Sequence, residues 1–220
     1  MRLLTLPGVF RPRPDSWLLA DLVRDQAPAG GRVLDLCTGS GVLALSAARG
    51  GAAAVTAVDC SRRAVWTARV NGLLRGTPVE VRRGDLFGPV AGRRFDLIVT
   101  NPPYLPSVDD ELPRHGPARA WEGGPDGRVL VDRICADVAR HLRPGGRLLM
   151  IHSDVCGIEA SCRALAAAGL EVDVPLRQAG RFGPLMRGRI GALRRRGALA
   201  GEGDDELVAV IRARRPPTPA

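Results

Sequence analysis

Several features of exported, membrane and metal-binding proteins are missing from this sequence of 220 residues. No apolar run reaches the length of a membrane-spanning helix, and the N-terminus lacks the basic-then-apolar pattern of a signal peptide. The five cysteines include no Cys-x-x-Cys pair, and His115, His141 and His152 lie in unrelated contexts. We therefore expect a cytoplasmic protein with reduced thiols, no bound metal and no membrane partner.

Lysine is also absent, so arginine supplies the basic charge behind the net value of +9 at pH 7. An excess of this kind favours polyanionic partners such as ribosomes and nucleic acids. A GC-rich genome would equally enrich a chain in Ala, Gly, Pro and Arg. The charge alone therefore does not identify a substrate.

Short β-rich runs alternate with helical patterns along the whole chain, which predicts an α/β fold with a mostly parallel sheet covered by helices on both faces. The length suits a single domain over residues 1–220. The expected strands cover residues 32–37, 53–58, 79–83, 95–100, 147–152, 170–176 and 206–213. The expected helices cover residues 15–26, 41–49, 61–74, 126–142 and 157–168.

Two segments stand apart from this alternation. Residues 1–30 form an opening segment and helix, in which Asp15 or Ser16 suits the N-cap or a direct contact with a ligand. Residues 178–205 form an arginine-rich insert before the last strand, which is long for a simple connection. The insert either contacts a macromolecule or forms a hairpin or short helix with solvated arginines.

The first expected strand leads into a Gly-x-Gly turn at Gly39 and Gly41. Glycines let the backbone approach a ligand closely, and Asp59, which ends the second strand, suits the two hydroxyls of a ribose. Gly39, Gly41 and Ala44 also fit the G-x-G-x-x-A pattern of an NAD site. A single match of that kind is weak evidence.

Acidic residues favour a different ligand. Asp35 precedes the turn, where it would repel a pyrophosphate but suit a cationic amino-acid group, and Asp85 follows the third strand, where it suits the amine of adenine. Leu86 would then lie against the ring. Each Asp alone is more typical of a loop cap or turn, but three after successive strands complement S-adenosylmethionine, which carries ribose, adenine and positive charge but no phosphate.

The tetrapeptide Asn101-Pro102-Pro103-Tyr104 directly follows the fourth expected strand. The Asn side-chain oxygen can accept a hydrogen bond from a planar NH2 group, the two prolines stiffen the backbone and remove N–H donors, and Tyr104 offers a flat face. Alone, these residues would more often be a proline-rich turn. Beside the acidic residues they predict a clamp for an amide or for the exocyclic amine of a base.

With these motifs the chain resembles the class I S-adenosylmethionine-dependent methyltransferases, and more narrowly the HemK-like glutamine-amide methyltransferases that modify translation release factors. The segments that carry the resemblance are Phe10–Leu19, Asp35–Gly41, Asn101–Tyr104, Trp121–Gly127 and Glu206–Ala213, together with Asp59 and Asp85. The resemblance implies a Rossmann-like, seven-stranded, mostly parallel sheet with an antiparallel last strand.

The resemblance also implies roles for individual residues. The cofactor site would be lined by Thr38, Gly39, Ser40, Gly41, Val42, Asp59, Leu86 and Asn101, and the substrate amide would be bound by Asn101, Pro102, Pro103 and Tyr104. Catalysis would rest on Asn101, Pro102 and Tyr104, with Asp15 or Ser16 near the acceptor.

Only about fourteen residues precede the first expected helix, so the chain is similar to the short branch of the family, whose archaeal and eukaryotic members work with a small partner subunit. A protein such as a release factor is the favoured acceptor. A base of RNA or DNA, a small metabolite, and a non-catalytic protein that keeps only the cofactor pocket are the alternatives.

Overall fold

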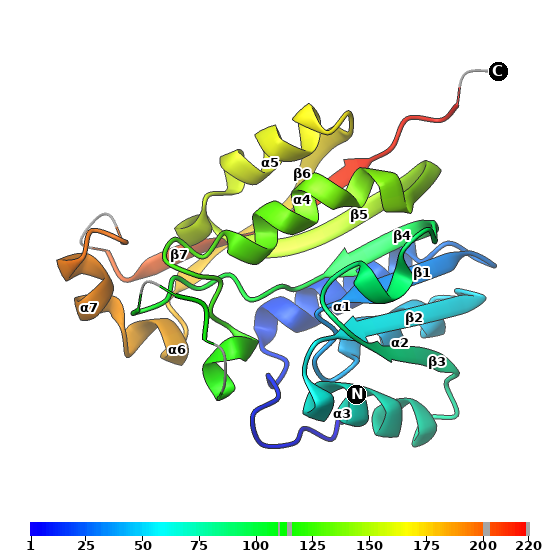
Figure 1. Cartoon of the computed structure of the whole chain (residues 1–220), viewed down its shortest axis with the longest axis horizontal. Helices are drawn as coiled ribbons and strands as arrows, with labels where there is room; N and C mark the ends of the chain where they lie inside the picture. The colour runs from blue at the N-terminus through cyan, green and yellow to red at the C-terminus, as the bar shows by residue number, and fades with distance from the viewer. Residues whose placement is uncertain (110, 114–115, 200–202, 219–220) are drawn as a thin grey trace.

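A seven-stranded sheet forms the centre of the computed structural model, which describes residues 1–109, 111–113, 116–199 and 203–218 (Figure 1). The strand order is β3-β2-β1-β4-β5-β7-β6, in which β7 runs antiparallel to both of its neighbours and the other pairings are parallel. The strands are β1 (Arg32–Leu36), β2 (Ala54–Asp59), β3 (Val79–Arg83), β4 (Phe95–Thr100), β5 (Leu142–Ser153), β6 (Glu171–Arg181) and β7 (Asp205–Arg214). The predicted topology, including the antiparallel last strand, is confirmed.

Helices cover both faces of the sheet (Figure 1). One face carries α4 (Val129–His141) and α5 (Ile158–Ala167), and the other carries α1 (Pro14–Gln26), α2 (Val42–Arg49) and α3 (Arg62–Leu73). Successive side chains of a strand point to opposite faces. Thus Leu34 and Leu36 of β1 join the core under α4, whereas Val33 joins the core under α1 and α2.

The start of α4 differs from the prediction. The helix begins at Val129 rather than at Asp126, because the preceding glycines are held in a loop: the Val129 N–H donates to the Gly123 carbonyl over 2.9 Å, and Gly127 has a φ of +77°. Strand β5 also begins earlier than predicted. It runs through Pro144 because Gly145 and Gly146 exchange backbone hydrogen bonds with Arg215 just beyond the end of β7.

The insert is built onto the sheet. Strand β6 extends to Arg181 rather than Leu176 and is followed by the short helices α6 (Pro184–Arg187) and α7 (Ile190–Arg195). Met186, Ile190 and Leu193 are buried in a small apolar cluster with Leu105. The described part of the insert therefore forms short helices and packs behind the Asn-Pro-Pro-Tyr loop, while residues 200–202 lie outside the described range. Contact of the insert with a macromolecule stays a prediction. In the described ranges, no helix has the length and apolar character needed to cross a membrane.

Candidate active site

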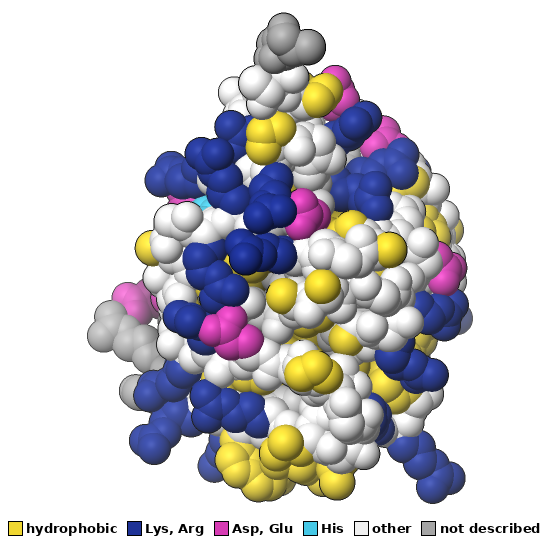
Figure 2. Space-filling view, turned by 90° about the vertical axis from the view of Figure 1, so that its right-hand side faces the viewer, with side chains coloured by type: hydrophobic (Ala, Val, Ile, Leu, Met, Phe, Trp, Pro, Cys, Tyr) yellow, Lys and Arg dark blue, Asp and Glu magenta, His cyan; other side chains and the backbone are white. Residues whose placement is uncertain are grey.

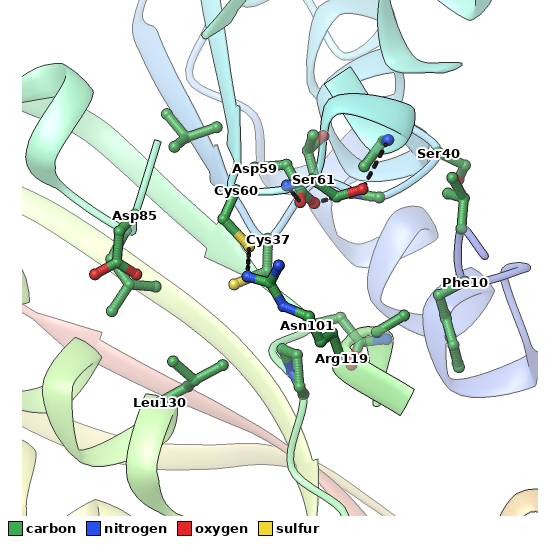
Figure 3. Close-up of a pocket in the computed structure, with 18 of the residues that line it drawn as sticks. Phe10, Cys37, Ser40, Asp59, Cys60, Ser61, Asp85, Asn101, Arg119 and Leu130 are labelled. Atoms are coloured by element: carbon green, nitrogen blue, oxygen red, sulfur yellow. Dashed lines mark hydrogen bonds between the residues drawn. The ribbon is translucent and has the colours of Figure 1, made fainter. Parts of the chain in front are cut away.

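A cavity of about 480 Å³ lies at the carboxyl ends of the parallel strands (Figure 3). We call it the larger cavity because a neighbouring cavity on the other side of Asn101 measures about 290 Å³. Its walls come from the loops that follow β1, β2, β3 and β4 and from the segment before α1. The predicted site residues that line it are Ser16, Thr38, Gly39, Ser40, Val42, Asp59, Asp85, Leu86, Asn101 and Pro103. The parallel sheet thus brings together side chains that are distant in the sequence.

Asp59 faces the larger cavity with both carboxylate oxygens fixed. Oδ2 accepts a hydrogen bond from the Gly39 N–H over 2.9 Å, and Oδ1 accepts one from the Ser61 N–H over 2.8 Å. Burial raises the pKa of Asp59, and these backbone donors together with the charge of Arg119 oppose the rise. Because each oxygen has a second lone pair, the carboxylate can also accept bonds from a pair of ligand hydroxyls.

Asp35 does not line the larger cavity, which corrects the predicted direct contact with a ligand. It is fully buried, and its Oδ2 accepts bonds from the Thr38 hydroxyl over 2.6 Å and from the Ala44 N–H over 3.0 Å. Desolvation raises its pKa to about 7. Asp35 therefore holds the turn and the first turn of α2 in place, while its Oδ1 is buried without a hydrogen-bond partner in the described structure.

Gly41 likewise supports the turn and is not part of the lining. Its φ is +83°, and a Cβ at this position would lie 3.2 Å from the Cβ of Ala68 on α3. Glycine is needed here for both the backbone conformation and the close approach of α3.

Two residues with a strained backbone conformation line the larger cavity. Within the described residues, Cys37 (φ 56°) and Leu86 (φ 41°) are the only non-glycine residues with a positive φ, and both line the larger cavity. Such conformations persist only where the surrounding structure enforces them, and they cluster at ligand sites. Sequence reasoning found Leu86 but missed Cys37, since nothing in a sequence pattern signals a strained cysteine.

Two arginines that were not predicted as site residues, Arg119 and Arg133, also line the larger cavity. Arg133 of α4 forms an ion pair with Asp85, so the carboxylate expected to meet an adenine amine already has a partner. Arg119, in the 3-10 helix Pro117–Ala120, donates from Nη2 to the Cys60 sulfur over 3.2 Å, across the larger cavity (Figure 3). Arg133 and Asp85 are 48 positions apart and Arg119 and Cys60 are 59 positions apart, so local sequence patterns do not predict these contacts.

A smaller cavity of about 290 Å³ lies on the other side of Asn101. Asn101, Phe10 and Ala120 line both cavities, whereas Pro102, Tyr104 and Asp15 line only the smaller one. The insert contributes residues 178–181 and 183–186 to its wall. The structure thus brings the whole predicted clamp to the boundary between two cavities.

The opening segment fixes the clamp. The Asn101 amide nitrogen donates to the Ser16 hydroxyl oxygen over 3.1 Å and to Oδ2 of Asp15 over 3.4 Å, and the Tyr104 hydroxyl donates to the same Asp15 oxygen over 3.3 Å. Asp15 and Ser16 lie in the first turn of α1, while the N-cap position is held by Arg13. Because the NH2 group of Asn101 is engaged, its Oδ1 remains an acceptor. Burial, followed by the charges of Asp15 and Glu206, raises the pKa of Tyr104 well above its usual value and keeps it neutral.

The glycine-rich segment packs against the backbone of the clamp. A Cβ on Gly127 would lie 2.1 Å from the Tyr104 carbonyl oxygen, and one on Gly123 would lie 2.7 Å from the Pro103 carbonyl oxygen. The Leu105 N–H donates to the Trp121 carbonyl over 2.9 Å. These glycines therefore set the position of the clamp without touching a ligand.

The larger cavity fits a ligand without phosphates. The Gly39 N–H already bonds Asp59 and the Gly41 N–H already bonds the Thr38 carbonyl, so these two turn amides are not free to hold a pyrophosphate as an NAD site requires. Asp59 offers acceptors for hydroxyls, and buried Leu86 offers an apolar wall. Across the described ranges, no three His, Cys, Asp or Glu residues are grouped so as to hold a metal ion; His115 lies outside those ranges.

Comparison with known proteins gives consistent results. A family model described as the methyltransferase small domain matches residues 1–112. A protein named as an N5-glutamine methyltransferase from Methanocaldococcus jannaschii is 32% identical over 180 residues, which is 82% of this chain and 90% of that protein. A release factor glutamine methyltransferase of Gloeobacter violaceus is 42% identical over 160 residues, which is 68% of this chain but only 56% of that relative's length.

Among solved structures, the Mtq2–Trm112 complex of E. cuniculi, described as responsible for methylating the termination factor eRF1, contains a chain that superposes with a TM-score of 0.65. The match covers 94% of this chain and 99% of that one at 21% identity, which supports the fold. The chain therefore belongs to the methyltransferase small-domain family, within which its relatives are the HemK-like glutamine methyltransferases.

Proposed function

We propose that this protein transfers a methyl group from S-adenosylmethionine to the side-chain amide nitrogen of a glutamine in a protein. The observation that carries the proposal is the position of Asn101, which lines both cavities and whose amide nitrogen is held by Ser16, so that its side-chain oxygen is left to accept a hydrogen bond. A methyl donor in the larger cavity and an amide in the smaller one would meet at this residue.

The larger cavity supplies the contacts that the donor requires. Asp59 would accept bonds from the ribose hydroxyls, Leu86 would contact the adenine, and the turn at Thr38–Gly39–Ser40 would pass beside the methionine portion. When bound, S-adenosylmethionine supplies an electrophilic methyl group on a positively charged sulfur. Asp85 would need to share its interaction with Arg133 in order to meet the adenine amine.

The clamp would make a poor nucleophile reactive. The lone pair of an amide nitrogen is delocalised into its carbonyl, so the nitrogen reacts only when it is held in line and its developing positive charge is stabilised. The Oδ1 of Asn101 and the carbonyl of Pro102 would accept the two amide hydrogens, with Tyr104 against the amide plane. Catalysis would rest on proximity and preorganised acceptors, and the methylated nitrogen would lose its proton to water without a dedicated base.

For the acceptor we propose a glutamine-containing protein of the translation machinery, such as a release factor. The relatives named above support this, since their names specify release factors or glutamine methylation. We place the reaction in the cytoplasm, where translation factors act. A small partner subunit is also proposed, in line with the two-chain Mtq2–Trm112 complex, and Leu73 and Leu74 at the end of α3, which are 80% and 70% exposed, offer it an apolar surface.

A second candidate is methylation of the exocyclic amine of an RNA base. The same clamp suits a flat NH2 group on a base, and Arg13 and Arg181, which line the smaller cavity, would meet a phosphate. Within the described residues, no comparable feature favours a small metabolite.

Transfer of a labelled methyl group separates these candidates. The purified protein is incubated with labelled S-adenosylmethionine and either release factors or ribosomal RNA, and the products are digested with RNase or protease. Label that survives RNase and appears in mass spectrometry as methylated glutamine supports the proposal. Label confined to RNA would reject it in favour of the second candidate.

A further inference from the structure

The edge of the sheet opposite the candidate active site carries a row of arginines. The strands β1, β4 and β5 begin at this edge, and the antiparallel β7 ends there. The arginines at these positions are Arg32, Arg94, Arg143, Arg147 and Arg214, and we call them the basic edge. Figure 2 shows this side of the molecule, where many arginine side chains and few acidic ones reach the surface.

Topology sets the spacing of the basic edge. The four strands are consecutive neighbours in the sheet, and adjacent strands lie about 4.8 Å apart, so the row is roughly 14 Å long. Arg32, Arg94 and Arg214 are exposed, and none of the described acidic residues pairs with them. Arg143 has a long contact of 3.5 Å with Asp96. The basic edge thus offers guanidinium groups that the protein itself leaves available.

Like charges are placed against one another at this edge. Arg147 of β5 lies directly opposite Arg214 of β7 in the antiparallel register, an arrangement that destabilises a sheet, and Glu171 of β6 lies opposite Arg214 on its other side. Burial, and then the nearby charges of Arg212 and Arg214, lower the pKa of Arg147. Its Nη2 donates to the Gln26 carbonyl over 2.5 Å, and within the described residues its Nε is buried without a hydrogen-bond partner. An anion bound at the edge would relieve this repulsion.

Other arginines on the same side have a structural explanation. Arg24, Arg49 and Arg140 lie in the last turns of α1, α2 and α4, where a positive charge interacts favourably with the helix dipole. The residues of the basic edge lie on strands or in the turns before them and gain no such stabilisation. Genomic composition would account for the abundance of arginine but not for an opposed pair within one sheet.

We propose that the basic edge binds the phosphate backbone of double-helical RNA. Guanidinium groups pair with phosphate oxygens through two parallel hydrogen bonds, and a row about 14 Å long spans several phosphates of one strand. No aromatic residue belongs to the basic edge, so it lacks the stacking platform that single strands require. The choice of RNA over DNA rests on the proposed function in translation.

The basic edge lies at the opposite end of the strands from the two cavities. The two cavities open at the carboxyl ends of the strands, so RNA bound at the opposite edge leaves both of them accessible. The protein would be held on structured RNA while its active site faces a protein acceptor nearby.

Fluorescence anisotropy with a labelled RNA duplex of about 16 base pairs, the length covered by a typical double-stranded RNA-binding domain, tests the proposal. The variant combines Arg32→Gln, Arg94→Gln and Arg214→Gln, three exposed residues whose loss should not affect folding. The matched control combines Arg62→Gln, Arg163→Gln and Arg195→Gln, which removes the same charge from α3, α5 and α7. Affinity is measured from about 50 to 200 mM salt.

We expect the basic-edge variant to bind RNA about tenfold more weakly at about 200 mM salt and by a larger factor at lower salt, because the slope of log affinity against log salt should fall by about 3. The control should bind like the parent chain. Equal loss in both variants, or no binding by the parent chain, would overturn the proposal. Tighter binding to a DNA duplex or to anionic vesicles would overturn the assignment to RNA. Because this assay involves no methyl transfer, its outcome is independent of whether glutamine methylation is found.

Discussion

The hydroxyl oxygen of Ser16 lies 3.1 Å from the side-chain amide nitrogen of Asn101 and accepts its hydrogen bond, although the two residues are 85 positions apart. This contact engages the NH2 group of Asn101. With the NH2 group held by the opening helix, the side-chain oxygen is left as the hydrogen-bond acceptor of the amide. The opening segment is therefore part of the clamp.

Replacing Asn101 by Ala should reduce turnover about a hundredfold, the usual effect of losing one preorganised hydrogen-bonding group. Donor affinity should change little, because Asp59 and the glycine turn remain. Single-turnover methyl transfer and calorimetric titration with S-adenosylmethionine measure the two quantities separately. Unchanged turnover would remove Asn101 from the mechanism.

Ser16→Ala should lower turnover by about fivefold, in line with the roughly 1 kcal/mol that a single neutral hydrogen bond contributes. The Asn101 amide would lose one of its two anchors and rotate more freely. The KM for the donor should stay constant while kcat falls. Ser46→Ala is the control, since Ser46 is buried in α2 away from both cavities; an equal effect there would show that Ser16 has no specific role.

Gly127→Ala should displace the clamp, because the new methyl group would lie 2.1 Å from the Tyr104 carbonyl oxygen. Gly76→Ala is a matched control: Gly76 also has a positive φ, but a Cβ there meets no atom within 4 Å. Gly76→Ala should lower the free energy of unfolding by about 1–2 kcal/mol, because alanine is strained in the left-handed conformation. Gly127→Ala should lower it by clearly more and should also reduce methyl transfer. Urea denaturation and a methyl-transfer assay measure both; equal losses would contradict the close contact.

Asp35 predicts a pH dependence of stability. Its folded pKa of about 7 lies above the ordinary 3.8, so the folded protein retains a proton that the unfolded chain releases. The folded state is therefore penalised progressively as the pH rises between about 4 and 7, by at most roughly 1.4 kcal/mol per pH unit. Asp35→Asn should remove that component, so that the variant gains stability relative to the parent chain as the pH rises through this window.

Urea titrations at several pH values check this prediction, with the exposed Asp109→Asn as control. If the free energy of unfolding changed with pH in the same way for the parent chain and for Asp35→Asn, Asp35 would ionise normally in the folded protein and the prediction would be wrong.

Arg189→Gln should loosen the insert. Arg189 pairs with Glu122 over 2.9 Å, and both side chains are only 12–13% exposed, so removing one partner leaves a largely buried charge uncompensated. Hydrogen exchange should rise in α6 and α7, and the KM for the protein acceptor should increase while donor affinity is unchanged. Arg177→Gln, which breaks an exposed ion pair with Glu159, should leave both unchanged. Protection in α6 equal to that of the parent chain would contradict the anchoring role.

Local sequence patterns predicted the limits of a helix or strand correctly where turn residues or a capping residue next to that element set them. Strands β3 and β4 have the predicted limits, and Ser61 caps α3 as expected by accepting a bond from the Ala64 N–H over 3.3 Å. Residues after successive parallel strands converge by topology, which is why Asp59, Leu86 and Asn101, all predicted from sequence, line the same cavity.

Features that depend on tertiary contacts were not predictable in this way. The late start of α4 follows from glycine packing against the clamp, and the role of Asp35 follows from complete burial, which its position before a turn does not reveal. Contacts such as Arg119 with Cys60 and Arg189 with Glu122 join residues 59 and 67 positions apart. Such pairs leave no periodic signal in the chain.

The wall that α6 contributes to the smaller cavity comes from a single connection between two strands at one end of the sheet, whereas the larger cavity depends on the loops of four other strands. Under the proposed function, exchange of the segment between β6 and β7 would therefore change how the methyl acceptor binds and leave the binding of the methyl donor unchanged. Such a swap offers a route to enzymes of new selectivity built on an unchanged reaction.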